Sequence, residues 1–256
     1  MTVTACAELV SRADPERFAA AMAAPPAARE VLFPLYAFNV EVSRAPWVTS
    51  EPMIAEMRLQ WWRDVLDEIA RGAAPRAHEV ATPLAGAIDA EAAAILDRAV
   101  AARRWDAYTD AFADAAAFDA HIDATSGGLM WVAARALGAD PETESVVRDF
   151  AFGAGLANWL RAIPALEARG RKPLVDGRPG AVQSLARTGL ARIRRARASR
   201  HGLDRRAAPA LFSGWQATAI LRQAAAAPER VAEGRLGLSE FGRRARLLTL
   251  GLTGRW

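Results

Sequence analysis

Three short segments carry the side chains best suited to chemistry on a ligand. Each combines aromatic rings, which pack on apolar chains, with amides or arginines, which bind anions. The segments are Leu35–Glu41 (LYAFNVE), Leu59–Asp64 (LQWWRD) and Asn158–Arg161 (NWLR), and Arg44 follows the first of them. We predict that they line one cavity, with Tyr36, Phe38, Asn39, Arg44, Trp62, Arg63, Asn158 and Arg161 as its candidate ligand-binding residues. No catalytic residue and no metal ligand is predicted.

Each of these side chains also has a simpler structural interpretation. Aromatic residues in a helical protein more often pack in the core than contact a ligand. Buried arginines need anionic partners, and Glu41 or Asp149 could satisfy them without any ligand. If a phosphorylated lipid binds, Arg44 and Arg161 are its expected counter-charge.

The first two segments, in this order near the N-terminus, resemble those of the squalene/phytoene synthase family, the head-to-head prenyl synthases. The segment Thr125–Leu129 (TSGGL) resembles a further family motif, and the order of helices resembles the family over nearly the whole chain. The resemblance implies an all-α, single-domain helical bundle of the isoprenoid synthase type over residues 1–256. It also implies chemistry on an allylic diphosphate, whose departure is assisted by magnesium ions held by two aspartate boxes.

Neither aspartate box is present at the positions that the resemblance assigns to it. After Tyr-Ala-Phe the first box would fall on Ser43, Arg44 and Trp47, and after Asn-x-Leu-Arg the second would fall on Ala162 and Leu166. Carboxylates at i and i+4 share one helix face and can reach one ion cluster. Their replacement at both boxes predicts that magnesium is not held here.

A displaced metal site is the alternative. Asp64 and Asp67 are its candidate ligands, although with Arg63 and Arg71 nearby they also fit a solvated helix face.

Within the family, the segment Arg58–Asp64 (RLQWWRD) resembles the branch that lacks both boxes and includes a mitochondrial assembly factor of respiratory complex I. This implies a non-catalytic protein that assists complex I assembly, with a respiratory-complex subunit or another membrane protein as partner. It also implies an isoprenoid or lipid ligand in the old active-site cavity, and no cofactor. The alternative is a prenyl transferase of the phytoene or squalene synthase type, which would use an isoprenyl diphosphate and magnesium.

Composition agrees with a helical protein in a reducing compartment. Hydrophobic residues make up 52% of the chain and alanine, the best helix former, is abundant. The single cysteine, Cys6, excludes an internal disulfide and a cysteine-built zinc site. The three histidines, His78, His121 and His201, are too far apart for metal-ligand spacing.

Turn residues and apolar spacing predict the helices. A helix is expected to start at Asp14 and Pro15 and to end at Pro25-Pro26. The third predicted helix, at about 52–71, is expected to be central to the bundle because it carries two adjacent apolar stripes. The remaining predicted ranges are about 27–42, 52–71, 91–105, 118–137, 142–162, 182–197, 209–226 and 239–250. Pro164 is expected to end or kink the helix 142–162, and a loop is expected at 170–180.

Location and partners are predicted from apolar runs and charge. No apolar run approaches the roughly 18 residues of a membrane span, and the acidic N-terminus does not resemble a signal sequence, so we expect a cytoplasmic protein, peripheral on the inner membrane. Eight arginines and one acid, Asp204, lie between Arg187 and Arg206. This stretch could contact an anionic membrane, an acidic protein or nucleic acid, or be a solvated face. Nucleic acid is not predicted, because no recognition motif or interleaved aromatics occur.

Overall fold

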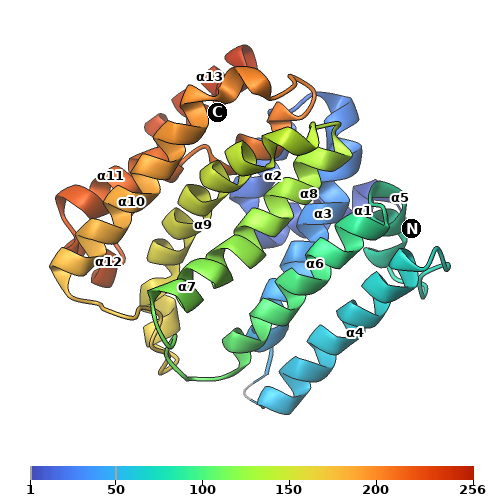
Figure 1. The fold of residues 1–256 in the computed structure, drawn as a ribbon, viewed down its shortest axis with the longest axis horizontal. Coiled ribbons are helices and arrows are strands. Elements are labelled where there is room, and N and C mark those ends of the chain that lie inside the picture. Colours follow the sequence, from blue (N-terminus) through green and yellow to red (C-terminus); the bar gives the residue numbers. More distant parts are fainter. Residues whose placement is uncertain (1, 50) are drawn as a thin grey trace.

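The protein is an all-α bundle. The computed structural model describes residues 2–49 and 51–256, and within these ranges it contains helices and turns but no strand (Figure 1). This confirms the predicted fold class. The helices are α1 (Val3–Ala13), α2 (Pro15–Met22), α3 (Pro26–Arg44), α4 (Pro52–Ala70), α5 (Ala81–Ala87), α6 (Ala90–Ala102), α7 (Ala115–Ile122), α8 (Gly128–Ala136), α9 (Glu144–Glu167), α10 (Pro179–Ala198), α11 (Ala217–Ala226), α12 (Glu229–Ala232) and α13 (Glu240–Thr253).

Helices α3 and α9 form the centre of the bundle. Both bury residues around most of their circumference, and α9 lies between α8 and α10 in Figure 1. Glycines let α10 approach α9 closely, because a Cβ on Gly153 would stand 2.4 Å from Cγ1 of Ile193 and 3.0 Å from the carbonyl oxygen of Gly189. The site described below is built on these two central helices.

Helix α4 lies at the edge of the bundle, where it packs on α6 (Figure 1). The prediction that it is central was wrong. Its first apolar stripe, which includes Leu59, Trp62 and Leu66, is buried, but the second reaches solvent and leaves Met57 66% exposed. Two adjacent apolar stripes therefore do not require burial on both sides, because single exposed apolar side chains are common on protein surfaces.

Two proline-dependent predictions had different outcomes. Asp14 caps α2 as predicted, with its carboxylate accepting a hydrogen bond from the backbone N–H of Arg17 at 3.0 Å and Pro15 in the first turn. Helix α9, by contrast, continues past Ala162 through Pro164 to Glu167. Ile163 and Leu166 are buried, so packing of this last turn outweighs the hydrogen bond that proline cannot donate.

The predicted helix over 118–137 is interrupted by a π-helical turn at Asp123–Gly127 between α7 and α8. This turn packs directly against α9, since a Cβ on Gly155 would stand 2.4 Å from the hydroxyl oxygen of Ser126. Such turns insert an extra residue and often occur at functional sites. Here the turn brings Thr125 and Ser126 to the site.

Several further elements differ from the sequence-based expectation. Helices α1, α5 and α12 were not predicted, and the first part of the expected helix 209–226 is a 3₁₀ segment, Ala208–Gly214. None of the helices in the described ranges combines the length and apolarity needed to span a bilayer.

Candidate functional site

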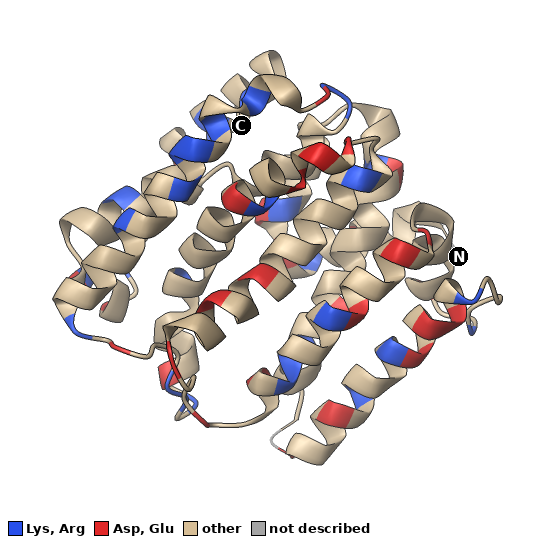
Figure 2. Cartoon of the chain, in the orientation of Figure 1, with Lys and Arg blue, Asp and Glu red and all other residues tan. Residues whose placement is uncertain are grey.

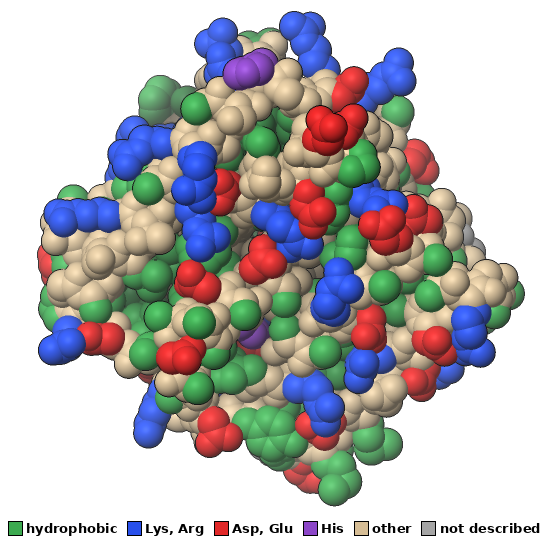
Figure 3. Space-filling model, viewed as in Figure 1, with side chains coloured by type: hydrophobic (Ala, Val, Ile, Leu, Met, Phe, Trp, Pro, Cys, Tyr) green, Lys and Arg blue, Asp and Glu red, His purple; other side chains and the backbone are tan. Residues whose placement is uncertain are grey.

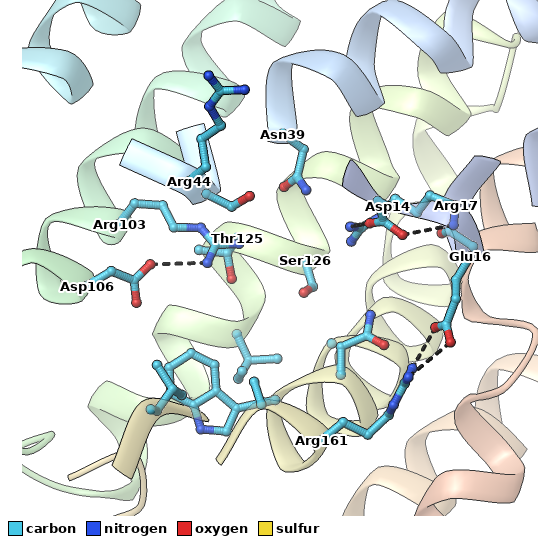
Figure 4. A pocket seen from close by; sticks show the side chains of 18 of the residues that line it. Asp14, Glu16, Arg17, Asn39, Arg44, Arg103, Asp106, Thr125, Ser126 and Arg161 are labelled. Carbon is cyan, nitrogen blue, oxygen red and sulfur yellow. Dashed lines mark hydrogen bonds and ion pairs between the residues drawn. The ribbon is translucent and has the colours of Figure 1, made fainter. Parts of the chain in front are cut away.

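A cavity of about 530 Å³ lies between α2, α3, α9 and the π-helical turn. On α3 it is lined by Asn39 and Ser43, and on α9 by Asn158 and Ala162, each pair four residues apart and so on one helix face. Its volume exceeds the roughly 300 Å³ at the lower end for ligand sites. The lining residues are Asp14, Glu16, Arg17, Asn39, Ser43, Arg44, Trp47, Arg103, Asp106, Ile122, Thr125, Ser126, Gly155, Asn158, Trp159, Arg161, Ala162, Leu166 and Ser213 (Figure 4).

Four of the predicted residues, Asn39, Arg44, Asn158 and Arg161, line this cavity. Tyr36 lies one helical turn before Asn39 and lines a small adjoining void of about 20 Å³, which shares Asn158 with the cavity. Burial raises the pKa of Tyr36, so its phenol stays protonated and neutral at physiological pH.

The other three predicted residues, Phe38, Trp62 and Arg63, do not line the cavity. Phe38 follows Tyr36 by two residues, which turns it to another side of α3, and there its ring meets that of Trp62 edge-on at 5.3 Å. Arg63 binds the carboxylate of Asp97 on α6 through Nε at 2.7 Å and Nη2 at 3.0 Å. The prediction that Trp62 and Arg63 line the cavity was wrong because α4 lies at the edge of the bundle, where its buried face contacts the core outside the cavity.

The wall beside α2 is charged, whereas an isoprenoid or lipid ligand would favour an apolar lining. Arg161 donates two hydrogen bonds to Glu16, at 2.5 and 3.0 Å, and Arg17 pairs with Asp14 at 2.6 Å (Figure 4). Burial alone would raise the pKa of Glu16, but hydrogen bonds from Arg161 and Gln216 lower it overall. The Glu16 carboxylate is therefore ionised, and both carboxylates on this wall are paired with arginines.

The opposite wall is formed in part by the 3₁₀ turn Arg103–Ala107, which comes directly after α6 in the sequence, and aromatic rings pack behind it. The buried Asp106 accepts a hydrogen bond from Arg103 at 3.1 Å, and Trp159 donates from its indole nitrogen to the carbonyl oxygen of Pro173 at 2.9 Å. Behind Trp159, at a ring distance of 5.1 Å, lies the buried His121. Burial lowers the pKa of His121 to about 4, so this wall holds a neutral imidazole.

Arg44 has the carboxylate partner that the simpler interpretation offered. Its guanidinium pairs with Glu41 at 3.1 Å, and in Figure 4 it points away from Ser126. The side chain is 46% exposed, so it can move without leaving a buried charge. Asp149, the other suggested partner, binds Arg195 instead, with an Nη2 to Oδ1 distance of 2.6 Å.

The positions of the missing aspartate boxes face the cavity: Ser43, Arg44 and Trp47 from the α3 side, and Ala162 and Leu166 from α9. The backbone thus still presents these five positions to one space. None of them offers a carboxylate, and the described part of the chain contains no group of three or more His, Cys, Asp or Glu side chains able to hold a metal ion. The residues present do not fit a magnesium cluster.

The displaced metal site has no support in the geometry. Asp67 pairs with Arg71 at 2.5 Å, and Asp64 accepts a hydrogen bond from Gln60 at 2.8 Å, both on α4 and away from the cavity. This is the solvated helix face considered as the simpler interpretation.

Sequence reasoning missed most of the charged wall. Asp14 was recognised only as a helix cap, and Glu16, Arg103 and Asp106 were not considered as site residues. No spacing rule connects them to α9, because the Glu16–Arg161 pair joins residues 145 positions apart. A signal was available for Thr125 and Ser126, which lie in the family-like segment Thr125–Leu129.

Comparisons with known proteins agree with this architecture. The sequence model of the squalene/phytoene synthase family matches residues 10–174, more than half of the chain. The chain belongs to the squalene/phytoene synthase family. Its fold superposes on a crystal structure of a dehydrosqualene synthase in complex with ligand, with a TM-score of 0.79 over 97% of this chain and 94% of that one. Sequence identity in that comparison is 12%, so it shows a shared fold alone.

Two curated relatives match a shorter segment. One is the NADH dehydrogenase (ubiquinone) complex I, assembly factor 6 homolog of Drosophila melanogaster, 42% identical over 64 residues. The other is complex I assembly factor 6 of Bos taurus, 36% identical over 64 residues. Each match covers 25% of this chain and 19% of the relative, so about four-fifths of each relative's length is unmatched.

Proposed function

We propose that this protein is a non-catalytic member of the squalene/phytoene synthase family that assists the assembly of respiratory complex I. One observation carries the proposal: the five aspartate-box positions still face the cavity, but they hold Ser43, Arg44, Trp47, Ala162 and Leu166. Ionising an allylic diphosphate requires cations against the departing group, and family chemistry obtains them from carboxylate-bound magnesium. The cavity does not offer that donor set.

The assembly role is supported by the two curated relatives, both of which are complex I assembly factors by name. An identity of 42% over 64 residues is well above that to the solved synthase, although the synthase shares the fold over nearly the whole chain. The expected partner is a subunit of the complex or another membrane protein that takes part in its assembly. The protein would act in the cytoplasm, at the surface of the inner membrane.

The cavity would bind an isoprenoid or another lipid without a metal or other cofactor. Ile122, Trp159 and Leu166 provide apolar surface, and the amides of Asn39 and Asn158 provide polar contacts. Arg44, the most exposed of the cavity arginines, is the cation best able to turn toward an anionic headgroup, since its pair with Glu41 is partly solvated and therefore weak.

A second candidate function is a prenyl transferase of the phytoene or squalene synthase type. The structural match to a dehydrosqualene synthase over 97% of the chain favours it. It requires a source of cations that the donor set in the cavity does not provide.

An activity assay separates the two candidates. The purified protein is incubated with a radiolabelled isoprenyl diphosphate and magnesium, beside a no-protein blank and an active dehydrosqualene synthase as positive control. We expect no head-to-head product above the blank. Magnesium-dependent product formation that is lost when the cavity is altered by Asn158→Leu would overturn the non-catalytic assignment.

The assembly role is tested in the cells that encode the protein. Deletion of the gene should lower the amount of assembled complex I on native gels and its NADH oxidation, and the intact gene should restore both. The variant Gly155→Val, which fills the contact between α9 and Ser126, should restore less than the exposed control variant Met57→Ala. Normal complex I levels in the deletion strain would contradict the proposal.

A further inference from the structure

Formal charge is distributed unevenly along this chain. Residues 200–256 contain ten arginines and four carboxylates and carry +6, whereas residues 1–199 sum to −2. In Figure 2 the Lys and Arg bands gather on α10 and near the C-terminus, and in Figure 3 basic side chains follow the same edge, while both signs alternate across the middle of the face. An anionic partner would be drawn to the C-terminal side.

The arginines in the middle of α10 are largely engaged within the protein. Arg195 binds Asp149, and Arg192 reaches Asp119 at 3.4 Å. Arg197 donates to the backbone carbonyl oxygen of Trp256 at 2.9 Å, and burial, together with neighbouring arginines, lowers its pKa. The stretch Arg187–Arg206 is therefore not one continuous free surface: Arg187 and Arg194 are exposed on α10, and Arg200, Arg205 and Arg206 are exposed at its C-terminal end.

A groove of about 840 Å³ lies at that end, between the end of α2, the segment 200–209 and the end of α13. It is lined by Arg29, Arg200, Arg205 and Arg255 together with His201, and by no Asp or Glu side chain. None of these four arginines forms an ion pair with any residue in the described ranges of the chain. Arg29 donates hydrogen bonds to the backbone carbonyl oxygens of Ala24 at 3.1 Å and Met22 at 2.9 Å, and the like charges around the groove together attract an anion.

Helix α13 leads into this groove with an exposed apolar stripe. Phe241, Leu248 and Leu252, spaced by seven and four residues, lie on one face and are 84%, 64% and 77% exposed. The stripe ends at the groove, because Gly251 and Thr253 line it and Gly251 packs beside Ala23 of the α2 end. Met22, also exposed, stands on the same rim.

We infer that the α13 stripe and the arginine groove together form a docking surface for an anionic lipid bilayer. Exposed phenylalanine and leucine side chains beside arginines match the layered chemistry of a membrane interface, where apolar groups enter the acyl boundary and guanidinium groups bind lipid phosphates. A nucleic acid offers the phosphates but no apolar layer for Leu248 and Leu252. The inference deepens the proposed function by naming the surface that would meet the membrane.

The test compares vesicle binding of the full chain and three double variants. Vesicles of phosphatidylcholine alone and of an equal mixture with phosphatidylglycerol are sedimented with the wild type, Leu248→Gln/Leu252→Gln, Arg205→Gln/Arg255→Gln, and the control Arg187→Gln/Arg194→Gln. The control removes the same charge from exposed positions on α10. The wild type should bind the anionic vesicles but not the vesicles of phosphatidylcholine alone. The stripe and groove variants should each lose at least about tenfold in partition coefficient, and the control less than about threefold.

A site-specific label adds an independent measurement. The only cysteine, Cys6, is buried and its thiol pKa is raised to about 11 by burial and by Glu79, so an introduced thiol reacts selectively. An environment-sensitive dye on Leu252→Cys should shift to the blue on anionic vesicles, whereas the same dye on Met57→Cys at the α4 edge should not.

Four outcomes would overturn the inference: equal binding to neutral vesicles, no binding to either kind, equal losses in the groove and α10 variants, or no dye shift at position 252. Binding that needs the groove arginines but not the stripe would also overturn it, in favour of a free phosphate-bearing ligand. These results do not depend on complex I, so they leave the assembly experiment to decide the proposed function by itself.

Discussion

The cavity and the C-terminal groove are both lined by arginines, but most cavity arginines are paired with carboxylates of the same wall, whereas the groove arginines form no ion pair within the described residues. In the cavity Arg17, Arg103 and Arg161 each bind a carboxylate of the same wall. In the groove Arg200 and Arg205 line a space that no Asp or Glu side chain lines. Except for Ser213, the residues that line the cavity lie in the region matched by the family model, residues 10–174, whereas the groove is formed mostly by residues beyond it.

The difference teaches what each region can bind. Paired charges fix their neighbours in place and leave little net field, so ligand selection in the cavity depends on shape and on its amides. Unpaired charges on a solvated face provide long-range attraction that salt screens. Binding at the groove should therefore weaken strongly with ionic strength, and binding in the cavity much less.

The largest expected effect concerns His121, behind the cavity wall. Burial lowers its pKa to about 4, against roughly 6.5 in an unfolded chain, so the unfolded state binds the proton first as pH falls. Stability attributable to this residue is complete above pH ~6.5 and is lost progressively down to pH ~4, by up to about 3 kcal/mol.

Urea unfolding at neutral pH and near pH 4.5 measures this effect. His121→Phe, which suits the surrounding rings, should lose much less stability on acidification than the wild type. Equal losses in the two proteins would show that the imidazole is not the group responsible.

The next largest effect on stability is expected from adding a methyl group to a glycine, which is closely packed at the cavity but loosely packed at the groove. Gly155→Ala places a Cβ 2.4 Å from the Ser126 hydroxyl oxygen and should cost about 2 kcal/mol, as overpacking does. Gly251→Ala, whose Cβ would be 3.9 Å from its nearest neighbour, should instead be neutral or stabilise α13 by about 0.5 kcal/mol. Thermal unfolding of both variants checks the contrast, which similar melting temperatures would refute.

A smaller effect is expected from the Glu16–Arg161 pair. Both side chains are partly exposed, so a double-mutant cycle with Glu16→Gln and Arg161→Leu should give a coupling of about 1 kcal/mol. The coupling should decrease only at a pH below the ordinary glutamate pKa of 4.5, because hydrogen bonds from Arg161 and Gln216 lower the pKa of Glu16 and protonation of its carboxylate breaks the pair. A coupling of zero at neutral pH would mean that the cavity charges are not held as pairs.

The smallest effect on stability is expected at the groove itself. Arg205→Gln removes no ion pair and relieves repulsion among like charges, so the free energy of unfolding should change by less than about 0.5 kcal/mol. Vesicle binding by the same variant should nevertheless fall. A marked loss of stability would indicate that the groove arginines are structural.

What the sequence by itself determined is local. Helix-forming composition and caps such as Asp14 and Pro15 give the fold class, and the residues after Tyr-Ala-Phe and Asn-Trp-Leu-Arg show that both aspartate boxes are replaced. Helical spacing also places Asn39 with Ser43 and Asn158 with Ala162 on cavity-facing sides, because positions four apart share a helix face.

Only the tertiary structure decided which helices meet. It put α4 at the edge, so that Trp62 packs on Phe38 and Arg63 binds Asp97 instead of lining the cavity. It joined Glu16 to Arg161 and brought the ends of α2 and α13 together around one groove. The physical reason is that spacing rules act within a few helical turns, whereas contacts between distant segments depend on how whole helix faces pack.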